Sequence, residues 1–173
     1  MIIKKQYFYK MILVTGATGF VGSELICLLA KKNLKVVGLY RNEVQKNKTI
    51  SLIKSRLKKN TGELENIKWV KANLKDFSSL ENAFLGIKKV FHCAALVSMA
   101  FKDQDRLFKI NQEGTSHIVN LCLKNNVRKL LYVSSIAALG NDKYENEINE
   151  YSPWDNSMEK TPYSYSKYGA ELE

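Results

Sequence analysis

Tyr163 and Lys167 are the residues of this sequence best suited to acid–base chemistry. They are four residues apart, so a helix would place the phenol and the ammonium on one face. A phenol keeps its proton at neutral pH, and a nearby positive charge favours the phenolate. The pair therefore predicts proton exchange with an alcohol or carbonyl oxygen as hydride moves to or from nicotinamide. Lys167 could also hold the nicotinamide ribose, whereas Tyr165 is expected on another side of the helix.

A second feature is the glycine-rich run Thr15-Gly-Ala-Thr-Gly-Phe-Val-Gly22. It follows an apolar strand predicted over 11–15 and opens a helix predicted over 20–32. Gly16, Gly19 and Gly22 recur every third residue, which lets backbone N–H groups approach a pyrophosphate at a helix N-terminus. We therefore predict a dinucleotide-binding turn.

The end of the next apolar strand, predicted over 35–40, bears on the choice between the two nicotinamide dinucleotides. It reads Leu39-Tyr-Arg-Asn42, without the carboxylate that usually holds the ribose 2′-hydroxyl of NAD. The guanidinium of Arg41 suits a 2′-phosphate, which favours NADP over NAD. In the alternative interpretation, Arg41 stacks on the adenine or faces solvent.

Strand and helix patterns alternate along the whole sequence. Further strands are predicted over 67–71, 89–93 and 130–134, with helices over 50–59, 78–85 and 105–125 and a last one from Pro162. Short apolar strands separated by helices predict an α/β fold with a doubly wound parallel sheet, which binds ligands at the carboxyl ends of its strands. The glycine turn and Arg41 fall at such ends, as do Asn73, Ala94-Ala95 and Ser134-Ser135. A serine hydroxyl there can orient the substrate oxygen.

Composition sets the remaining expectations. The 173 residues carry a net charge of +10, but the lysines are scattered and no nucleic-acid motif is present, so nucleic acid is not expected as a partner. No apolar run approaches a membrane span, and residues 1–10 lack the features of a signal peptide, so we treat them as an N-terminal extension. Three cysteines and two histidines without metal-ligand spacing predict reduced thiols, structural histidines, no metal site and a cytoplasmic protein.

Taken in order, the motifs resemble those of the extended short-chain dehydrogenase/reductases, in the NAD-dependent epimerase/dehydratase group. The matching stretches cover nearly everything from Met11 onward. Within that group the sequence is most similar to dihydroflavonol 4-reductase and 3β-hydroxysteroid dehydrogenase relatives. The stretches are Thr15–Gly22, Asn73–Asp76, His92–Ala95, Asn111–Thr115, Tyr132–Gly140 and Tyr163–Lys167.

The resemblance implies a role for each matched residue. Ser135, Tyr163 and Lys167 would be catalytic, and Asn111 would brace the cofactor site. Asn73 stands where the family usually has Asp, which removes one expected contact with the adenine. The residues expected at the cofactor are Gly16, Thr18, Gly19, Phe20, Val21, Gly22, Arg41, Asn73, Leu74, Ala94, Ala95, Asn111, Ser134, Tyr163 and Lys167.

The resemblance also sets the expected domain organisation. Family members continue past the last helix into a substrate domain, so residues 11–173 are expected to be a dinucleotide-binding domain that is incomplete at its C-terminus. Packing of the Tyr163 helix against its neighbour, as in relatives, would give a homodimer. The acidic segment 140–161 either borders the active site or is a surface excursion.

Three functions remain open on the sequence alone. The favoured one is an oxidoreductase acting on a small carbonyl or alcohol. The others are a nucleotide-sugar epimerase or dehydratase with tightly held NAD, and a dinucleotide sensor without catalysis. The candidate residues on the substrate side are mainly apolar, which favours a substrate without a nucleotide: Val97, Ser98, Met99, Phe101 and Leu139.

Overall fold

The computed structural model describes residues 11–57, 62–140, 148–154 and 160–173. Its centre is a five-stranded parallel sheet in the order β3-β2-β1-β4-β5, which confirms the predicted fold class. The predicted extension over residues 1–10 lies outside the described residues. The strands are β1 (Met11–Thr15), β2 (Val36–Tyr40), β3 (Ile67–Lys71), β4 (Ile87–His92) and β5 (Lys129–Tyr132).

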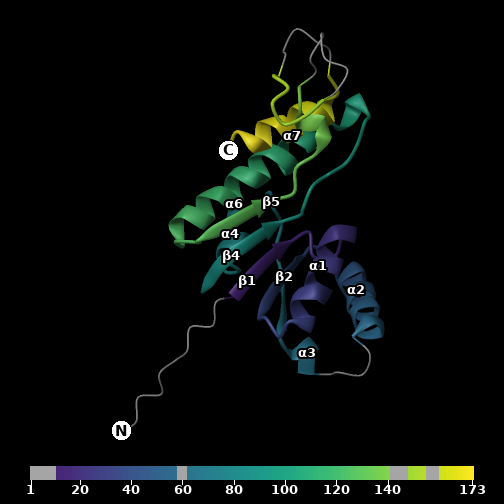
Figure 1. The fold of residues 1–173 in the computed structure, drawn as a ribbon, viewed down its shortest axis with the longest axis vertical. Helices are drawn as coiled ribbons and strands as arrows, with labels where there is room; N and C mark the ends of the chain where they lie inside the picture. Colours follow the sequence, from purple (N-terminus) through teal and green to yellow (C-terminus); the bar gives the residue numbers. More distant parts are fainter. Residues whose placement is uncertain (1–10, 58–61, 141–147, 155–159) are drawn as a thin grey trace.

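Helices cover both faces of this sheet (Figure 1). On one side lie α1 (Phe20–Lys31), α2 (Glu43–Arg56) and α3 (Gly62–Glu65). On the other side lie α4 (Phe77–Glu81), α6 (Glu113–Lys124) and α7 (Pro162–Glu171). Shorter helical segments lead into α6 or follow β5: η1 (Phe101–Asp103), α5 (Gln104–Leu107), η2 (Phe108–Gln112) and η3 (Ile136–Ala138).

Alternation along β1 divides the core into two layers. Ile12 and Val14 pack towards α1 and α2, together with Ile26 and Ile53. Leu13 points to the opposite face, where the core continues into α4 and α6 through residues such as Leu80, Phe84, Ile118 and Leu121. Because both faces of β1 are buried, this strand is apolar at nearly every position, as expected for the middle of a parallel sheet.

Two helix starts differ from the prediction because of capping side chains. Helix α2 begins at Glu43 and not near residue 50, since the Asn42 side chain accepts a hydrogen bond from the Gln45 N–H at 3.1 Å. Helix α4 is capped by Asp76, whose Oδ1 accepts from the Ser79 N–H at 3.2 Å, and not by Ser78. It ends at Glu81, four residues earlier than predicted.

The helix predicted over 105–125 is interrupted by a wider turn. Its middle, η2, has π-helical hydrogen bonding, which is frequent at functional sites. Its apolar face is buried at Leu107, Ile118, Leu121 and Cys122. In α1 the buried face includes Ile26, Cys27, Leu29 and Ala30, whereas Val21 and Leu28 are about half exposed.

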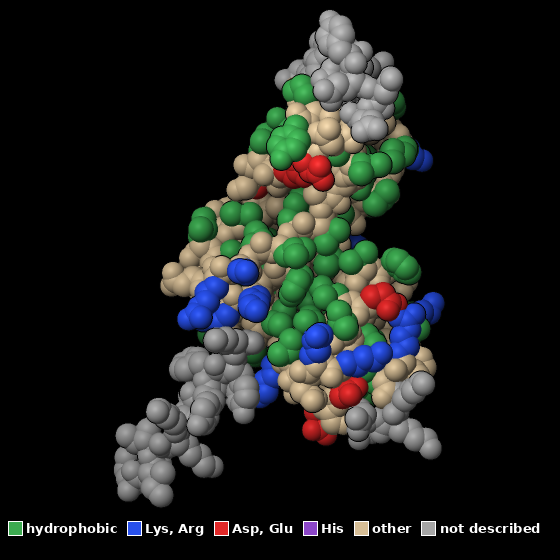
Figure 2. Space-filling view, in the orientation of Figure 1, with side chains coloured by type: hydrophobic (Ala, Val, Ile, Leu, Met, Phe, Trp, Pro, Cys, Tyr) green, Lys and Arg blue, Asp and Glu red, His purple; other side chains and the backbone are tan. Residues whose placement is uncertain are grey.

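Strand β5 forms one edge of the sheet. Its Leu130 and Leu131 are 37% and 50% exposed. On the face drawn in Figure 2, hydrophobic side chains run through the middle of the surface, and Lys and Arg side chains form separate groups on either side. No helix among the described residues is long and apolar enough to cross a membrane.

Candidate active site and cofactor groove

The turn between β1 and α1 is shaped by close backbone approach. Gly16 has φ +63°, and a Cβ there would lie 2.8 Å from the backbone of Ala94. The Gly19 N–H donates to the Gly16 carbonyl at 2.9 Å. A Cβ on Gly22 would lie 2.2 Å from that same carbonyl oxygen, so α1 packs directly beneath the turn. Glycine is therefore required at Gly16 and Gly22 for close backbone contact, and at Gly16 also for its positive φ.

The N-terminus of α1 offers donors to an anion. Gly19 is the N-cap residue, no side chain caps the helix, and the first turn holds no acidic residue. The first N–H groups of a helix have no partner within the helix and lie at its positive end. This end of α1 therefore suits a pyrophosphate.

A groove of about 380 Å³ opens beside this turn, across the carboxyl ends of β1, β2 and β4. Eight predicted cofactor residues line it: Gly16, Thr18, Gly19, Arg41, Asn73, Leu74, Ala94 and Ala95. Seven further lining residues were not predicted: Thr15, Leu39, Tyr40, Gln45, Ala72, Cys93 and Ile110. Had the start of α2 been predicted at Glu43, Gln45 would have fallen in the first turn of that helix and would have been a candidate for the groove.

Seven of the predicted cofactor residues lie outside the lining of this groove: Phe20, Val21, Gly22, Asn111, Ser134, Tyr163 and Lys167. Phe20 is 87% exposed at the start of α1, and Gly22 is buried under the turn. The groove thus accounts for the adenosine and pyrophosphate side of the predicted site. The cofactor roles of the other residues stay predictions.

Arg41 is exposed at the rim of the groove, beyond the end of β2. The nearest acidic residue in sequence, Glu43, is already engaged. It accepts a hydrogen bond from the Tyr40 hydroxyl at 2.6 Å and pairs with Lys46 at 2.5 Å. Lys46 also lies over the Tyr40 ring, 4.6 Å from its centre. Lys46 therefore compensates the charge of Glu43, and Arg41 contributes a positive charge to the rim of the groove.

Asn73 and Leu74 are fixed by neighbouring elements. The Asn73 N–H donates to Ser79 Oγ at 3.0 Å, and its side-chain oxygen accepts from the Lys75 N–H at 3.2 Å. The Leu74 carbonyl is 2.7 Å from Nδ1 of His117, which identifies that nitrogen as the donor. This contact gives His117 the structural role that was predicted for it.

Helix α7 presents Tyr163 and Lys167 to the protein interior. Thr161 caps the helix by accepting from the Ser164 N–H at 3.1 Å, and Pro162 is its first residue. Tyr163 is 8% exposed and Lys167 is 1% exposed. Tyr165 is 45% exposed on another side, as predicted.

The Lys167 ammonium makes two hydrogen bonds that were not predicted. It donates to the Tyr132 hydroxyl and, at 2.9 Å, to the Val133 carbonyl. Among the described residues, its phenolic partner is thus Tyr132 on β5 and not Tyr163. Burial lowers the pKa of Lys167 to about 8, and the nearby Glu171 opposes that shift. Lys167 is therefore still cationic at neutral pH.

The two serines after β5 have different partners. Ser135 Oγ accepts from the Ala137 N–H at 3.1 Å and caps η3, a segment that contacts α7. Ser134 Oγ donates to the carboxylate of Glu171 at the end of α7. From the sequence we expected Ser134 at the cofactor and Ser135 at the substrate. In the structure each hydroxyl has a local hydrogen-bond partner.

Asn111, which the resemblance placed at the cofactor site, links neighbouring segments of the fold through its side chain. Its Nδ2 donates to the Leu96 carbonyl at 2.9 Å and to Ser166 Oγ at 2.9 Å, and its Oδ1 accepts from the Leu96 N–H at 2.7 Å. The side chain is 1% exposed. One amide thus joins the segment after β4, the η2 turn and α7.

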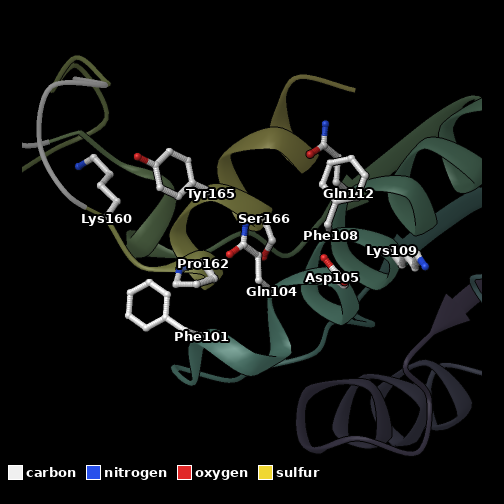
Figure 3. Close-up of a pocket in the computed structure, with 10 residues that line it drawn as sticks. All are labelled: Phe101, Gln104, Asp105, Phe108, Lys109, Gln112, Lys160, Pro162, Tyr165 and Ser166. Carbon is white, nitrogen blue, oxygen red and sulfur yellow. The ribbon is translucent and has the colours of Figure 1, made fainter.

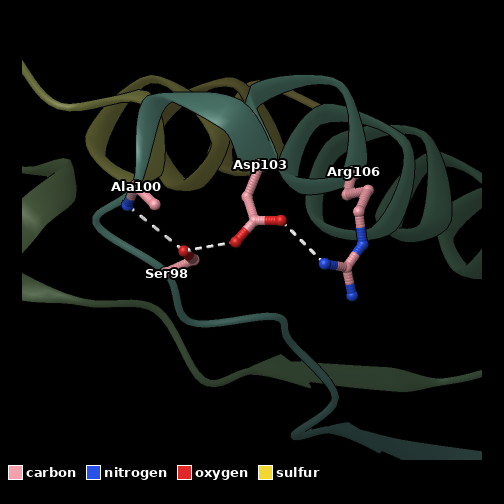
Figure 4. Close-up of polar contacts among 4 residues, drawn as sticks. All are labelled: Ser98, Ala100, Asp103 and Arg106. Carbon is pink, nitrogen blue, oxygen red and sulfur yellow. Dashed lines mark hydrogen bonds and ion pairs between the residues drawn. The ribbon is translucent and has the colours of Figure 1, made fainter.

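A polar cluster fastens the same segment further along (Figure 4). Ser98 Oγ donates to Asp103 at 2.7 Å and accepts from the Ala100 N–H at 3.2 Å. Arg106 donates to the other oxygen of Asp103 at 2.7 Å. This fastening leaves Val97, Met99 and Phe101 more than 60% exposed, whereas Leu139 is intermediate.

A second cavity, of about 400 Å³, lies between the α5–η2 segment and α7 (Figure 3). Aromatic rings from both sides frame it, among them Phe101, Phe108 and Tyr165. Nearby, Trp154 stacks on Tyr168 with ring centres 4.0 Å apart. The described end of the acidic segment therefore packs on α7, while its residues 141–147 and 155–159 lie outside the described part.

The described residues contain no group of three His, Cys, Asp or Glu side chains that could hold a metal ion. The three cysteines are free thiols, with Cys27 and Cys122 buried and Cys93 half-buried. Burial raises the pKa of the Cys122 thiol to about 11 and also raises that of Cys93. These thiols are consequently poor nucleophiles at neutral pH.

The parallel sheet, the glycine turn and the Tyr-x-x-x-Lys helix define a Rossmann-type domain of the short-chain dehydrogenase/reductase superfamily. The family model described as "NAD dependent epimerase/dehydratase family" matches residues 12–172. The chain belongs to the NAD-dependent epimerase/dehydratase family, whose members are NAD-dependent enzymes.

Individual relatives carry different activities. A dTDP-D-glucose 4,6-dehydratase from Dictyostelium discoideum is 35% identical over 97% of this chain and 40% of its own length. A 3 beta-hydroxysteroid dehydrogenase/Delta 5-->4-isomerase from Monkeypox virus is 29% identical over 91% of this chain and 43% of its own length. The chain thus spans less than half of the length of these relatives.

A solved structure supports the fold. A short-chain dehydrogenase/reductase superfamily protein from Agrobacterium tumefaciens, crystallised with bound NAD, is 27% identical to this chain. The match covers 94% of this chain and 43% of that chain, with a TM-score of 0.71. The family and the fold are thus established, and the individual reaction is a separate question.

Proposed function

We propose that this chain is the dinucleotide-binding part of an NADP-dependent oxidoreductase that interconverts a small carbonyl compound and its alcohol. The observation that carries the proposal is the placement of the glycine turn, the exposed Arg41 and the buried Lys167 at the carboxyl edge of one parallel sheet. Ser135 and Tyr163 complete the acid–base group. The reaction and substrate are proposed for the whole protein, because this chain spans less than half of the length of the dehydratase and dehydrogenase relatives.

The residues of the groove fit a nicotinamide dinucleotide. The uncapped N-terminus of α1 suits the pyrophosphate, and a Cβ at Gly16 would meet the Ala94 backbone at 2.8 Å. Arg41 would bind the 2′-phosphate through its planar guanidinium, and Asn73 and Leu74 would flank the adenine. When bound, the nicotinamide supplies or accepts the hydride.

We assign the proton transfer to side chains of this chain. The Tyr163 phenol would exchange a proton with the substrate oxygen, and the Ser135 hydroxyl would orient that oxygen. The positive charge of Lys167 favours the phenolate form of a neighbouring tyrosine. Since the pKa of Lys167 is about 8, we expect this support to weaken as pH rises above 8.

The surface beyond the groove favours an apolar substrate. Val97, Met99 and Phe101 are 66%, 61% and 68% exposed on the segment after β4. Apolar groups exposed together often mark a binding surface. We therefore favour a carbonyl compound without a nucleotide handle.

The test is hydride transfer from NADPH and NADH to a panel of small aldehydes and ketones, followed by cofactor absorbance. Net consumption of NADPH that is lost in Tyr163→Phe and kept in Tyr165→Phe supports the proposal. Tyr165 is the matched control because it lies on the same helix and faces outward. Cofactor consumption that survives Tyr163→Phe would contradict the proposed acid–base role.

A nucleotide-sugar dehydratase or epimerase is the second candidate, favoured by the 35% identity to the dehydratase from Dictyostelium discoideum. Such an enzyme would convert its sugar without net consumption of cofactor. The same assay, run with a dTDP-hexose and analysed for sugar products, separates the two. If the protein were a dinucleotide sensor, the wild type and Tyr163→Phe would bind the cofactor equally well, and neither would convert a substrate.

We also propose that the chain forms a homodimer through the face that holds the aromatic cavity. Phe101, Phe108 and Tyr165 are 68%, 47% and 45% exposed there, and both signs of charge are present through Asp105, Lys109 and Lys160. A twofold interface must be self-complementary, which a mixed aromatic and charged face allows. Sedimentation of the wild type and of Phe108→Glu tests this: a dimer should become a monomer.

The free thiols fit a reducing compartment such as the cytoplasm.

A further inference from the structure

A continuous set of buried polar side chains lies beneath the proposed active site. It comprises Thr15 on β1, His92 on β4, Thr115 on α6, Tyr132 on β5 and Lys167 on α7. Thr15, His92, Thr115 and Lys167 are each at most 2% exposed. Buried polar groups are costly unless they are hydrogen-bonded, so the bonds within this group are informative.

The distances within the group fix the direction of each hydrogen bond. The Thr115 hydroxyl donates its one proton to the Asn111 carbonyl at 2.5 Å. His92 Nε2, 3.0 Å away, must therefore be the donor to Thr115 Oγ1. His92 Nδ1 then accepts from the Thr15 hydroxyl at 2.6 Å, and Thr15 Oγ1 in turn accepts from the Ala94 N–H at 3.1 Å. The group thus requires a neutral His92 that is protonated on Nε2.

Tyr132 joins this group to Lys167. Its hydroxyl accepts a hydrogen bond from the Lys167 ammonium. The Tyr132 ring is stacked on His92, with centres 5.4 Å apart and planes at 29°. The phenol is therefore held both at its ring and at its hydroxyl.

We propose that Tyr132 is a positioning residue: its hydroxyl fixes the Lys167 ammonium beside the active site, and its ring is held by stacking on His92, which Thr115 anchors in turn. The inference rests on the proposed role of Lys167. It assigns a function to a phenol that the acid–base group of Ser135, Tyr163 and Lys167 does not use.

The charges around Lys167 agree with this role. The titratable groups that interact with it are Tyr132 from β5, His92 from β4 and Glu171 from α7, and Tyr163 precedes it by four residues on α7. Burial lowers the pKa of His92 to about 3, and Lys167 contributes to that shift. His92 therefore stays neutral and does not repel the ammonium. Burial also raises the pKa of Tyr132, so its hydroxyl remains a neutral partner.

The test is the pKa of Lys167, measured by NMR titration of the side-chain Cε and Nζ signals in the chain without cofactor or substrate. Tyr132→Phe keeps the ring on His92 and removes only the hydroxyl. Loss of a hydrogen bond to a charged group should lower the pKa of Lys167 by about one unit, a tenfold change in proton affinity. Tyr165→Phe, which removes a hydroxyl from the outer side of α7, should leave that pKa unchanged.

A structural role alone would lower the stability of Tyr132→Phe and leave the pKa of Lys167 unmoved, and that result would overturn the proposal. Thr115→Val and Thr115→Ser give an independent pair if Tyr132→Phe does not fold. Thr115→Val removes the acceptor of His92 Nε2, and His92 carries the Tyr132 ring, so we expect a smaller fall in the Lys167 pKa in Thr115→Val and recovery in Thr115→Ser. Equal values in the two variants would contradict the role of the Thr115–His92 contact in holding Tyr132.

The tautomer of His92 supplies a second readout. Its ring-nitrogen shifts should show a proton on Nε2 in the wild type and in Tyr132→Phe, and a proton on Nδ1 would contradict the assigned bond directions. Since none of these measurements uses turnover, they can fail while the proposed oxidoreductase activity holds. Conversely, a chain without activity can still show the predicted shift.

Discussion

The glycine turn after β1 and the polar group around Lys167 lie at the same edge of the sheet, but different atoms set their geometry. The turn is made of backbone: Gly16 has φ +63° and Gly22 packs against the Gly16 carbonyl. The surroundings of Lys167 are mainly side chains from β1, β4, β5, α6 and α7, together with the Val133 carbonyl. In the first region a Cβ added at Gly16 or Gly22 would clash with backbone atoms, whereas the second region depends on individual hydroxyls and a ring nitrogen.

The difference explains what each region can do. A backbone turn binds any phosphate of suitable shape, because its donors are peptide N–H groups common to every sequence. A side-chain group can instead set the position and the pKa of one ammonium. Cofactor binding and acid–base chemistry are therefore separable, and substitutions should affect them separately.

The largest effect is expected at the acid–base group. Tyr163→Phe removes the proposed proton donor and should lower kcat by about 10²- to 10⁴-fold, because a positioned acid or base contributes on that order. Cofactor affinity should change little, since Tyr163 lies outside the groove lining. Steady-state rates combined with NADPH titration measure both. A matched loss of affinity would mean that the two regions are not separable.

The turn can be tested by adding one methyl group. Gly16→Ala places a Cβ 2.8 Å from the Ala94 backbone at positive φ, so we expect the free energy of unfolding to fall by about 2–4 kcal/mol and NADPH binding to be lost. Gly86→Ala is the control, because Gly86 has φ +75° but its Cβ would meet only the end of the Met11 side chain. That variant should lose about 1 kcal/mol and keep its affinity.

His92 makes stability depend on pH. Its pKa is about 3 in the folded chain, against an ordinary value of 6.5, so between these values the unfolded chain binds a proton that the folded chain does not. Stability should therefore fall as pH decreases, by about 2.3 kcal/mol between pH 6.5 and 4.5. Urea unfolding at pH 7 and 4.5 measures this fall, and His92→Gln should reduce it by about that amount. An equal fall in both proteins would show that His92 is not held neutral.

The smallest effect is expected at the rim of the groove. Arg41→Ala should weaken NADPH binding by about tenfold and leave NADH binding nearly unchanged, since one charge-assisted contact with the 2′-phosphate is lost. Equilibrium titration of both cofactors at one salt concentration gives the ratio. Equal weakening of both would support the interpretation in which Arg41 stacks on the adenine.

Much of the first region could be predicted from sequence. The strand pattern, the glycine spacing and the strand ends identified eight residues that line the groove. The start of α2 was missed because its buried residues are few, Thr49 and Ile53, so the helix has little apolar periodicity. The capping role of Asn42 was the available signal.

The second region was predicted in part. The Tyr-x-x-x-Lys spacing placed both side chains on the inner side of α7, but the partner of Lys167 is Tyr132, 35 residues earlier. Thr15 and His92 are 77 residues apart. Spacing rules describe neighbours within one helix or strand, whereas these contacts arise only when five elements pack together. Each of these residues alone resembles an ordinary core position.

Calorimetric titration of the folded wild-type chain with NADPH, and then with NADH, tests the central claim most directly. We predict saturable binding at one site per chain, tighter for NADPH than for NADH. Tighter binding of NADH would overturn the choice of NADP and favour the dehydratase or epimerase. The absence of binding to either cofactor would contradict the claim that this groove is a dinucleotide site.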